Sequence, residues 1–274
     1  MRVFEKLIME EFKRVFGIKF IMVFTVTVLL NIGLFVYSSS EGKSMSDIRQ
    51  ETHYRQWIIG ELSDMQPEEA LEIADIQSDS VIKRKYDELE SEEQTVYSRQ
   101  LNKIKEQLEY IVKYPEDIKN IQNNADTLKS FSIFADKKSF TYNNIQKTAK
   151  DFKRVEGVQV YLTDNKAVDS FVTYYYIYYL SLILNVFVLY ELFGERENGM
   201  WCIVHTSKSG RAKLAFNRTM IITASAFIIT GVLFFTTFLT SFILYKTASI
   251  NAPIQNIESF SRFSLPMSQL EYII

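Results

Sequence analysis

Three long stretches without any charged side chain interrupt an otherwise polar chain. They cover residues 20–37, 170–190 and 219–245, which are 18, 21 and 27 residues long. A helix rises about 1.5 Å per residue and the hydrocarbon core of a bilayer is about 30 Å thick, so about 20 apolar residues span it. The pattern predicts three transmembrane helices, and therefore a mainly α, polytopic membrane protein.

Basic side chains are concentrated in two of the segments that flank these stretches. Residues 1–19 contain five Lys and Arg, residues 191–218 contain five, and residues 246–274 contain only two. Lys and Arg accumulate on the cytoplasmic side of a membrane protein. Three crossings place the first two segments on the same side, so we expect both to be cytoplasmic. Residues 38–169 and 246–274 are then expected outside a cell membrane, the latter as a tail.

Residues 38–169 predict an extracytoplasmic domain that is almost entirely helical. The segment carries 19 Lys and Arg against 25 Asp and Glu, a net charge of −6. Nucleic acid is therefore not an expected partner, because binding to phosphates needs a basic surface. We predict one helix over 46–64 and another over about 80–113, the second ended by Tyr114-Pro115 because the residue before a proline disfavours the helical region.

Apolar residues within the second of these helices recur at steps of four and three. They are Tyr97, Leu101, Ile104, Leu108 and Ile111. This is the spacing of an a/d seam. Two interpretations follow: a hairpin of long helices packed within the domain, or a coiled-coil contact with a second copy of the chain.

Two further segments have a weaker pattern. Residues 3–17 alternate apolar and charged positions at helical spacing, which predicts an amphipathic helix lying in the headgroup plane, within the cytoplasmic segment 1–19. The alternative is a plain cytoplasmic extension of the first span. Residues 155–164 resemble one arm of a β-hairpin, and the sequence does not decide between this and irregular structure.

The three apolar stretches contain neutral polar side chains and no Asp, Glu, Lys, Arg or His. Ion-coupled transporters place ionisable groups in their spans, so this composition argues against an ion-driven pump. Asn31 and Asn185 are read as contacts between helices, with contact to a substrate as the alternative. The tyrosines at 174–179 are read as an interfacial belt, or as an aromatic wall for an amphiphilic substrate.

Candidate catalytic chemistry is sparse. The single cysteine, Cys202, is read as a small packing residue, and His53 and His205 fall on opposite sides of the expected membrane. No phosphate-binding loop, zinc-binding helix or nucleophile elbow occurs in the sequence. We therefore expect no intrinsic enzyme activity, no cofactor and no metal site.

The segment between the second and third stretches has a distinctive composition. A carboxylate cluster and a glycine are followed by a short apolar piece, then by a polar turn and a basic helix. The residues concerned are Glu191, Glu195, Glu197, Gly199, Ser209, Gly210 and Arg211. On physical grounds this is either a short helix on the cytoplasmic surface, with charges of both signs available to a partner, or a plain connecting loop.

This arrangement resembles the membrane (permease) subunits of type-2 ATP-binding-cassette exporters, in the Gram-positive variant with a large extracytoplasmic insertion between the first two spans. Glu195, Glu197 and Gly199 match the acidic part of their loop, and Ser209, Gly210 and Arg211 match its turn. The resemblance implies that residues 191–218 couple the chain to a separate ATP-binding subunit.

The same resemblance implies a partner within the membrane. Subunits of that family usually have six spans, whereas this sequence predicts three. Either the chain is a half-size unit that pairs with a second membrane half or with its own copy, or it is truncated after three spans. A different class of function also stays open: a membrane-anchored, extracytoplasmic binding or sensor module without transport activity. The substrate is not indicated.

Overall fold

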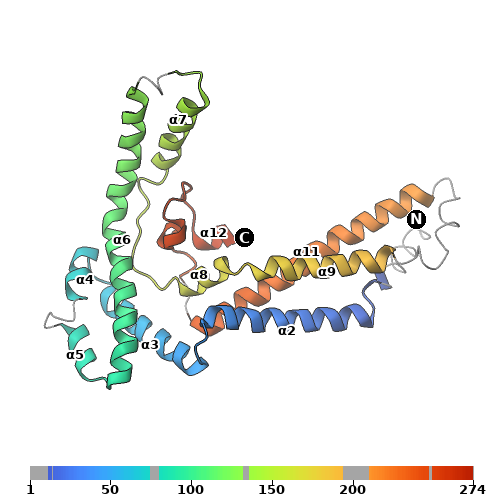
Figure 1. Cartoon of the computed structure of the whole chain (residues 1–274), viewed down its shortest axis with the longest axis horizontal. Coiled ribbons are helices and arrows are strands. Elements are labelled where there is room, and N and C mark those ends of the chain that lie inside the picture. Colours follow the sequence, from blue (N-terminus) through green and yellow to red (C-terminus); the bar gives the residue numbers. More distant parts are fainter. Residues whose placement is uncertain are drawn as a thin grey trace. The chain divides into compact units, whose positions relative to one another are not determined.

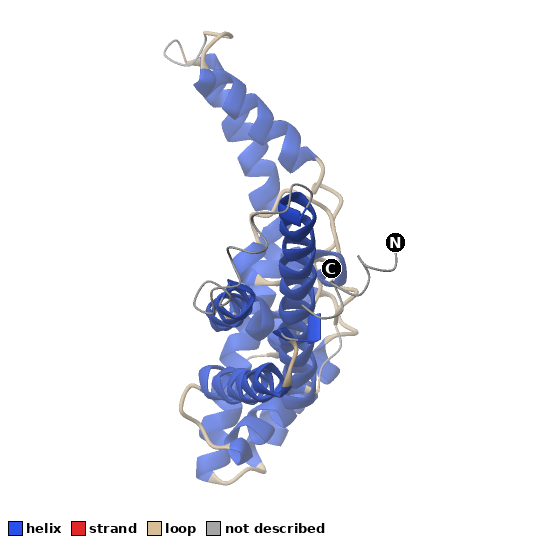
Figure 2. Cartoon of the chain, turned by 90° about the vertical axis from the view of Figure 1, so that its right-hand side faces the viewer, coloured by secondary structure: helices blue, strands red, loops and turns tan. Residues whose placement is uncertain are grey.

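The computed structural model describes residues 12–13, 15–74, 80–131, 136–193, 210–246 and 249–273. The described residues are 79% helical and contain no strand (Figure 2), so the prediction of a mainly α protein is confirmed. The chain divides into two compact units. The membrane unit comprises Met1–Gly42 and Ser170–Ile243, and the polar unit comprises Lys43–Asp169 and Leu244–Ile274.

The membrane unit is built on three long helices, α2 (Ile18–Ser40), α9 (Tyr176–Phe193) and α11 (Gly210–Tyr245) (Figure 1). Three stretches within them are long and apolar enough to cross a membrane: Ile18–Ser40, Tyr176–Phe193 and Ala215–Tyr245, with mean hydropathies of 2.3, 1.6 and 2.2. The expected polytopic architecture is therefore present.

Only one side of each long helix is covered by its neighbours. Phe35, Leu184 and Leu233 are fully buried, whereas Phe227 is 77% exposed and Ile243 is 68% exposed. Leaving a large apolar side chain in water forgoes roughly 1.5–3 kcal/mol of burial energy. Many such side chains remain uncovered on these helices, which is the surface that a lipid environment accommodates.

The second apolar stretch differs from the prediction of one continuous helix over 170–190. Helix α8 (Lys166–Thr173) ends first, two non-helical residues follow, and α9 begins at Tyr176. Tyr174 occupies this break with only 4% of its surface exposed. Within the tyrosine run, Tyr178 and Tyr179 are exposed and remain available to an interfacial belt, whereas Tyr174 is buried.

The polar unit is organised around α6 (Ser91–Ser130), the longest helix. Helices α3 (Met45–Leu62), α4 (Pro67–Ile73), α5 (Val81–Asp87) and α7 (Phe140–Lys153) pack against it (Figure 1). Helix α3 begins with a capping box, in which the Ser44 side chain and the Asp47 side chain each bond the other residue's backbone N–H.

The seam predicted from the sequence faces the interior of this unit. All five of its side chains are at most 4% exposed and form one core with residues of α3 and α4 such as Ile58, Leu62 and Ala70. Of the two interpretations, the structure therefore supports packing within the domain, because the chain itself already covers the seam.

The expected helix over 80–113 begins where α5 begins, but it is wrong in being continuous and in ending before Pro115. Helix α5 stops at Asp87, and the Gln94 side chain donates to the carbonyls of Tyr86 (3.2 Å) and Leu89 (3.0 Å), which holds a turn before α6. At the other end α6 continues through Pro115 to Ser130. An internal proline costs a helix about 3 kcal/mol or more. Burial of Tyr114, just before the proline, and of apolar residues after it offsets that cost.

Residues 158–165 form neither helix nor strand, which resolves the ambiguous 155–164 segment in favour of irregular structure. A side chain replaces the missing strand partner: Asn256 donates to the carbonyl of Tyr161 (2.8 Å) and accepts from its N–H (3.4 Å). Asn256 ends a 3₁₀ turn, η3 (Ile254–Asn256), which is followed by η4 (Glu258–Phe260) and α12 (Gln269–Ile273). The segment after α11 is thus an integral part of the polar unit.

Candidate functional site

A buried hydrogen-bond cluster joins the helices of the membrane unit. Asn31 on α2 is fully buried, and its Nδ2 donates to Thr237 Oγ1 (2.8 Å) and the Leu233 carbonyl (3.4 Å) on α11. The Tyr174 hydroxyl donates to Asn31 Oδ1 at 3.1 Å. The polar atoms of Asn31 are therefore engaged by protein groups, which favours the packing interpretation over contact with a substrate.

A second polar contact joins α9 to α11. The hydroxyls of Ser181 and Thr230 lie 2.8 Å apart, and Asn185 Nδ2 donates to the Ser181 carbonyl at 2.8 Å. Asn185 Oδ1 is buried and has no hydrogen-bond partner among the described residues. Neutral side chains thus hold the spans together, and within the apolar stretches no charged group assists them.

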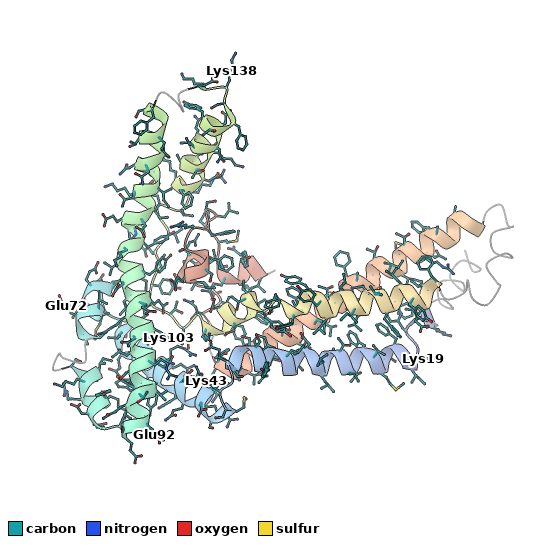
Figure 3. The ribbon with its side chains drawn as sticks, in the orientation of Figure 1. Lys19, Lys43, Glu72, Glu92, Lys103 and Lys138 are labelled. Atoms are coloured by element: carbon teal, nitrogen blue, oxygen red, sulfur yellow. The ribbon has the colours of Figure 1, made fainter. Side chains whose placement is uncertain are left out.

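The polar unit contains a pocket of about 350 Å³. Its wall is formed by α3, α6, residues 163–169 and residues 256–259, and Figure 3 marks Lys103 on α6. Charged side chains of both signs line it: the cations Arg55, Lys103 and Lys166, and the carboxylates Glu106, Asp164, Asp169 and Glu258. A volume of this size lies at the lower end of the range for small-molecule sites, about 300–1,000 Å³.

An ion pair with little solvent access forms part of this wall. Arg55 Nε lies 2.8 Å from Asp164 Oδ1, and the two side chains are 12% and 8% exposed. The guanidinium carbon of Arg55 also lies 5.8 Å from the centroid of the Tyr245 ring. Arg55 Nη2 and Asp164 Oδ2 are both buried without a hydrogen-bond partner in the described part of the chain. The pair is therefore only half satisfied, which is costly for buried charges.

The loop that carries Asp164 is held from several directions. Gln107 Nε2 on α6 donates to the Thr163 carbonyl at 3.0 Å, and the Thr163 hydroxyl bonds to that of Ser249. Asn165 Nδ2 donates to the Asn256 carbonyl at 2.9 Å, and its Oδ1 accepts from Gln269 Nε2 at 2.7 Å. These bonds fix the loop before any ligand arrives, so the pocket is preformed.

Helix α8, which follows this loop, carries a carboxyl group with an altered pKa in its first turn. Burial raises the pKa of Asp169 above its usual value, and the nearby charge of Lys166 lowers it in part. Desolvation disfavours the ionised form, and a positive charge close by restores it. Among the described residues, those of the pocket included, no group of three or more His, Cys, Asp or Glu side chains is placed to hold a metal ion.

The coupling residues predicted from the sequence lie mostly outside the described residues. This applies to Glu195, Glu197, Gly199 and Ser209. Of the others, Glu191 lies in the last turn of α9, and Gly210 and Arg211 begin α11.

The two borders of that segment do meet. The guanidinium of Arg218 on α11 lies 5.6 Å from the centroid of the Phe193 ring at the end of α9, and Arg218 is 6% exposed. Arg218 is one of the basic residues from which the cytoplasmic side was predicted. It is largely buried against an aromatic ring, which is a cation–π arrangement.

The sequence did not single out the pocket. Its residues come from α3, α6, the loop before α8, the start of α8 and the segment after α11, and no local spacing relates position 55 to 164 or 256. The only available signal was the cluster of polar residues at 163–166, in a stretch with neither helical nor strand periodicity.

Comparison with known proteins identifies no relative: no protein-family model, no curated protein and no solved structure matches the chain.

Proposed function

We propose that this chain is a membrane-spanning permease subunit, or a half-size unit of one, of an ATP-driven export system. The observation that carries the proposal is the packing of three apolar helices on neutral polar contacts such as Asn31 with Thr237. The apolar stretches offer no ionisable group for coupling to an ion gradient. Energy for transport therefore comes from a partner in this proposal, and the sequence has no phosphate-binding loop of its own.

In this proposal the membrane unit is oriented by its basic borders. The N-terminus and residues 191–218 face the cytoplasm, and the polar unit lies outside the cell. Residues 191–218 receive the separate ATP-binding subunit, through the acidic cluster at Glu195 and Glu197 and the turn at Ser209-Gly210-Arg211. A second membrane half, either another chain or a copy of this one, completes the path.

The test is co-purification of the tagged chain from native membranes in mild detergent. We expect a nucleotide-binding protein and ATPase activity in the eluate, and loss of both when Glu195 and Glu197 are replaced by Lys. The matched control replaces Glu68 and Glu69, two exposed glutamates in the first turn of α4, by Lys. The proposal fails if no nucleotide-binding protein is recovered, or if both double variants retain it equally.

A second candidate function is favoured by the pocket in the polar unit. Every residue that lines it belongs to that unit, so the pocket is formed without any contribution from the spans. The chain would then be an extracytoplasmic binding or sensor module that the spans anchor. Co-purification separates the two functions, because an anchored binding module is expected to bind its ligand and to recover no ATPase.

A further inference from the structure

The charges around the pocket in the polar unit are nearly balanced. Three cationic and four carboxylate side chains line it, and amide side chains such as Gln107 and Asn165 lie between them. A site for a polyanion would need an excess of cations, and a site for a simple cation would need an excess of carboxylates. A wall of mixed sign suits a ligand that itself carries both signs.

The ion pair at Arg55 and Asp164 has bonding capacity left over. One guanidinium nitrogen and one carboxylate oxygen are buried without partners in the described residues, on side chains that line the pocket. Buried polar atoms are nearly always hydrogen-bonded, and those left unpaired call for an explanation. The unpaired donor is complementary to a carboxylate, and the unpaired acceptor is complementary to an ammonium group.

We propose that this pocket binds a small zwitterion with an ammonium and a carboxylate group, of the size of an amino acid or a dipeptide. The carboxylate lies toward Arg55 and Lys103, and the ammonium group toward Asp164 and Asp169. The inference rests on the binding function proposed above and is independent of the export function.

Size and shape support this class of ligand. The pocket of about 350 Å³ is too small for a long peptide, and the apolar side chains of Ile59 and Ile257 leave room for a short side chain between the charged groups. Tyr110 lies beside them, and its hydroxyl donates to the Gln255 carbonyl at 2.9 Å, which fixes the ring. A preformed wall lowers the entropic cost of binding.

Burial of Asp169 adds a charge argument. Burial desolvates its carboxyl group and raises its pKa, and the nearby charge of Lys166 offsets this shift only in part. An ammonium group placed beside Asp169 would add positive charge there, and its attraction to the carboxylate would be stronger in a partly dehydrated pocket than in water.

The test uses the full-length chain, purified in detergent and titrated with L-alanine and L-alanyl-L-alanine by isothermal calorimetry. N-acetyl-L-alanyl-L-alanine lacks the ammonium group, and L-alanyl-L-alaninamide lacks the carboxylate. We expect saturable binding of at least one zwitterion, and affinities about tenfold or more lower for both capped dipeptides, because each has lost a charged hydrogen bond.

Variants locate the binding site. Asp164→Asn keeps the shape of the side chain and Lys103→Gln removes a cation from the wall, so each should weaken binding of the zwitterion about tenfold. Lys113→Gln, on the same helix, is the matched control: Lys113 pairs with Glu109 at 3.4 Å, does not line the pocket and is 66% exposed. Circular dichroism and gel filtration confirm that each variant is folded.

The outcomes separate the ligand class from the binding function. Capped dipeptides that bind as tightly as the zwitterions, or a preference for glycerophosphoethanolamine, would retain a binding pocket and overturn the amino-acid class. Absence of saturable heat for every compound up to about 10 mM, with a folded chain, would overturn both. Retention of full affinity in both Asp164→Asn and Lys103→Gln would overturn this location.

Discussion

Asn31 on α2 and Thr237 on α11 share a buried hydrogen bond of 2.8 Å across 206 positions of sequence. It joins the first candidate span to the last one. Replacing Asn31 by Leu removes this bond and those to Leu233 and Tyr174. We expect a loss of about 1 kcal/mol, and at most about 2 kcal/mol, because side-chain bonds between membrane helices are modest. Unfolding in mixed detergent micelles measures it.

The control for that experiment is Thr25→Val on the same helix. Thr25 is exposed, and among the described residues it bonds only to the Ile21 carbonyl within α2. The stability of this variant should equal that of the parent chain. Equal stabilities for Asn31→Leu and Thr25→Val would show that the cluster does not hold the spans together.

Two buried tyrosines of α6 provide a matched pair. The Tyr97 hydroxyl donates to the Ile82 carbonyl at 3.2 Å, whereas the Tyr114 hydroxyl is buried without a partner among the described residues. Tyr97→Phe should lower the free energy of unfolding by about 1 kcal/mol. Tyr114→Phe should leave it unchanged or raise it by up to about 1 kcal/mol, because an unpaired buried hydroxyl disappears. Chemical denaturation followed by circular dichroism distinguishes them, and the reverse order would contradict the assignment.

Pro115 lies inside α6, where it deprives the Ile111 carbonyl of a helical donor. Pro115→Ala should therefore raise the free energy of unfolding by about 1–3 kcal/mol. Pro67 stands at the start of α4, where a helix has no use for that N–H. Pro67→Ala should lower stability by up to about 1 kcal/mol, since the unfolded chain gains freedom. Thermal unfolding would refute the comparison if Pro115→Ala were the less stable variant.

The raised pKa of Asp169 predicts how the free energy of unfolding changes with pH. Its folded-state pKa is raised, mainly by burial, so the folded chain binds a proton more tightly than the unfolded chain. The free energy of unfolding therefore falls as pH rises from the ordinary Asp value through the raised one, and is constant above it. Asp169→Asn should abolish this decrease, as measured by denaturant unfolding between pH 3 and pH 8.

Asp47 supplies the control of opposite sign. A hydrogen bond from Ser44 lowers its pKa, so its contribution is present above the ordinary Asp value and is lost as pH falls through the lowered one. Asp47→Asn should remove a decrease at the acid end. Identical pH profiles for Asp169→Asn and the parent chain would contradict the role of burial at Asp169.

The a/d seam shows what the spacing of apolar residues can and cannot predict. Tyr97, Leu101 and Leu108 recur at helical spacing, and all three lie in the core of the polar unit. Their spacing indicated that one face of the helix is covered, because apolar periodicity reports burial directly. It did not say by what, and both interpretations of the seam were compatible with it. The pattern did not reveal the turn before α6, which the Gln94 side chain holds through bonds to nearby carbonyls. It also did not reveal that α6 continues through Pro115, because burial of the surrounding helix outweighs the local preference of proline.

The pocket, unlike the seam, could not be predicted from local pattern. Arg55 and Asp164 are 109 positions apart, and Asn256 reaches Tyr161 across 95. Charged and amide residues are common on any solvated helix or loop, so their types carry no positional signal. The coupling residues at 195–209 stay a prediction, since they lie outside the described residues.

The amino-acid sequence by itself determined that the chain is mainly helical and has three helices able to cross a membrane. The length and hydropathy of a segment are local properties, and they decide whether that segment can span a bilayer. Only the tertiary structure decided that the segment after α11 completes the polar unit, that Tyr174 bonds to Asn31, and that Arg55 and Asp164 share a pocket wall. Such contacts depend on the way the chain folds back on itself, and a hydrogen bond between distant residues leaves no periodicity in the sequence.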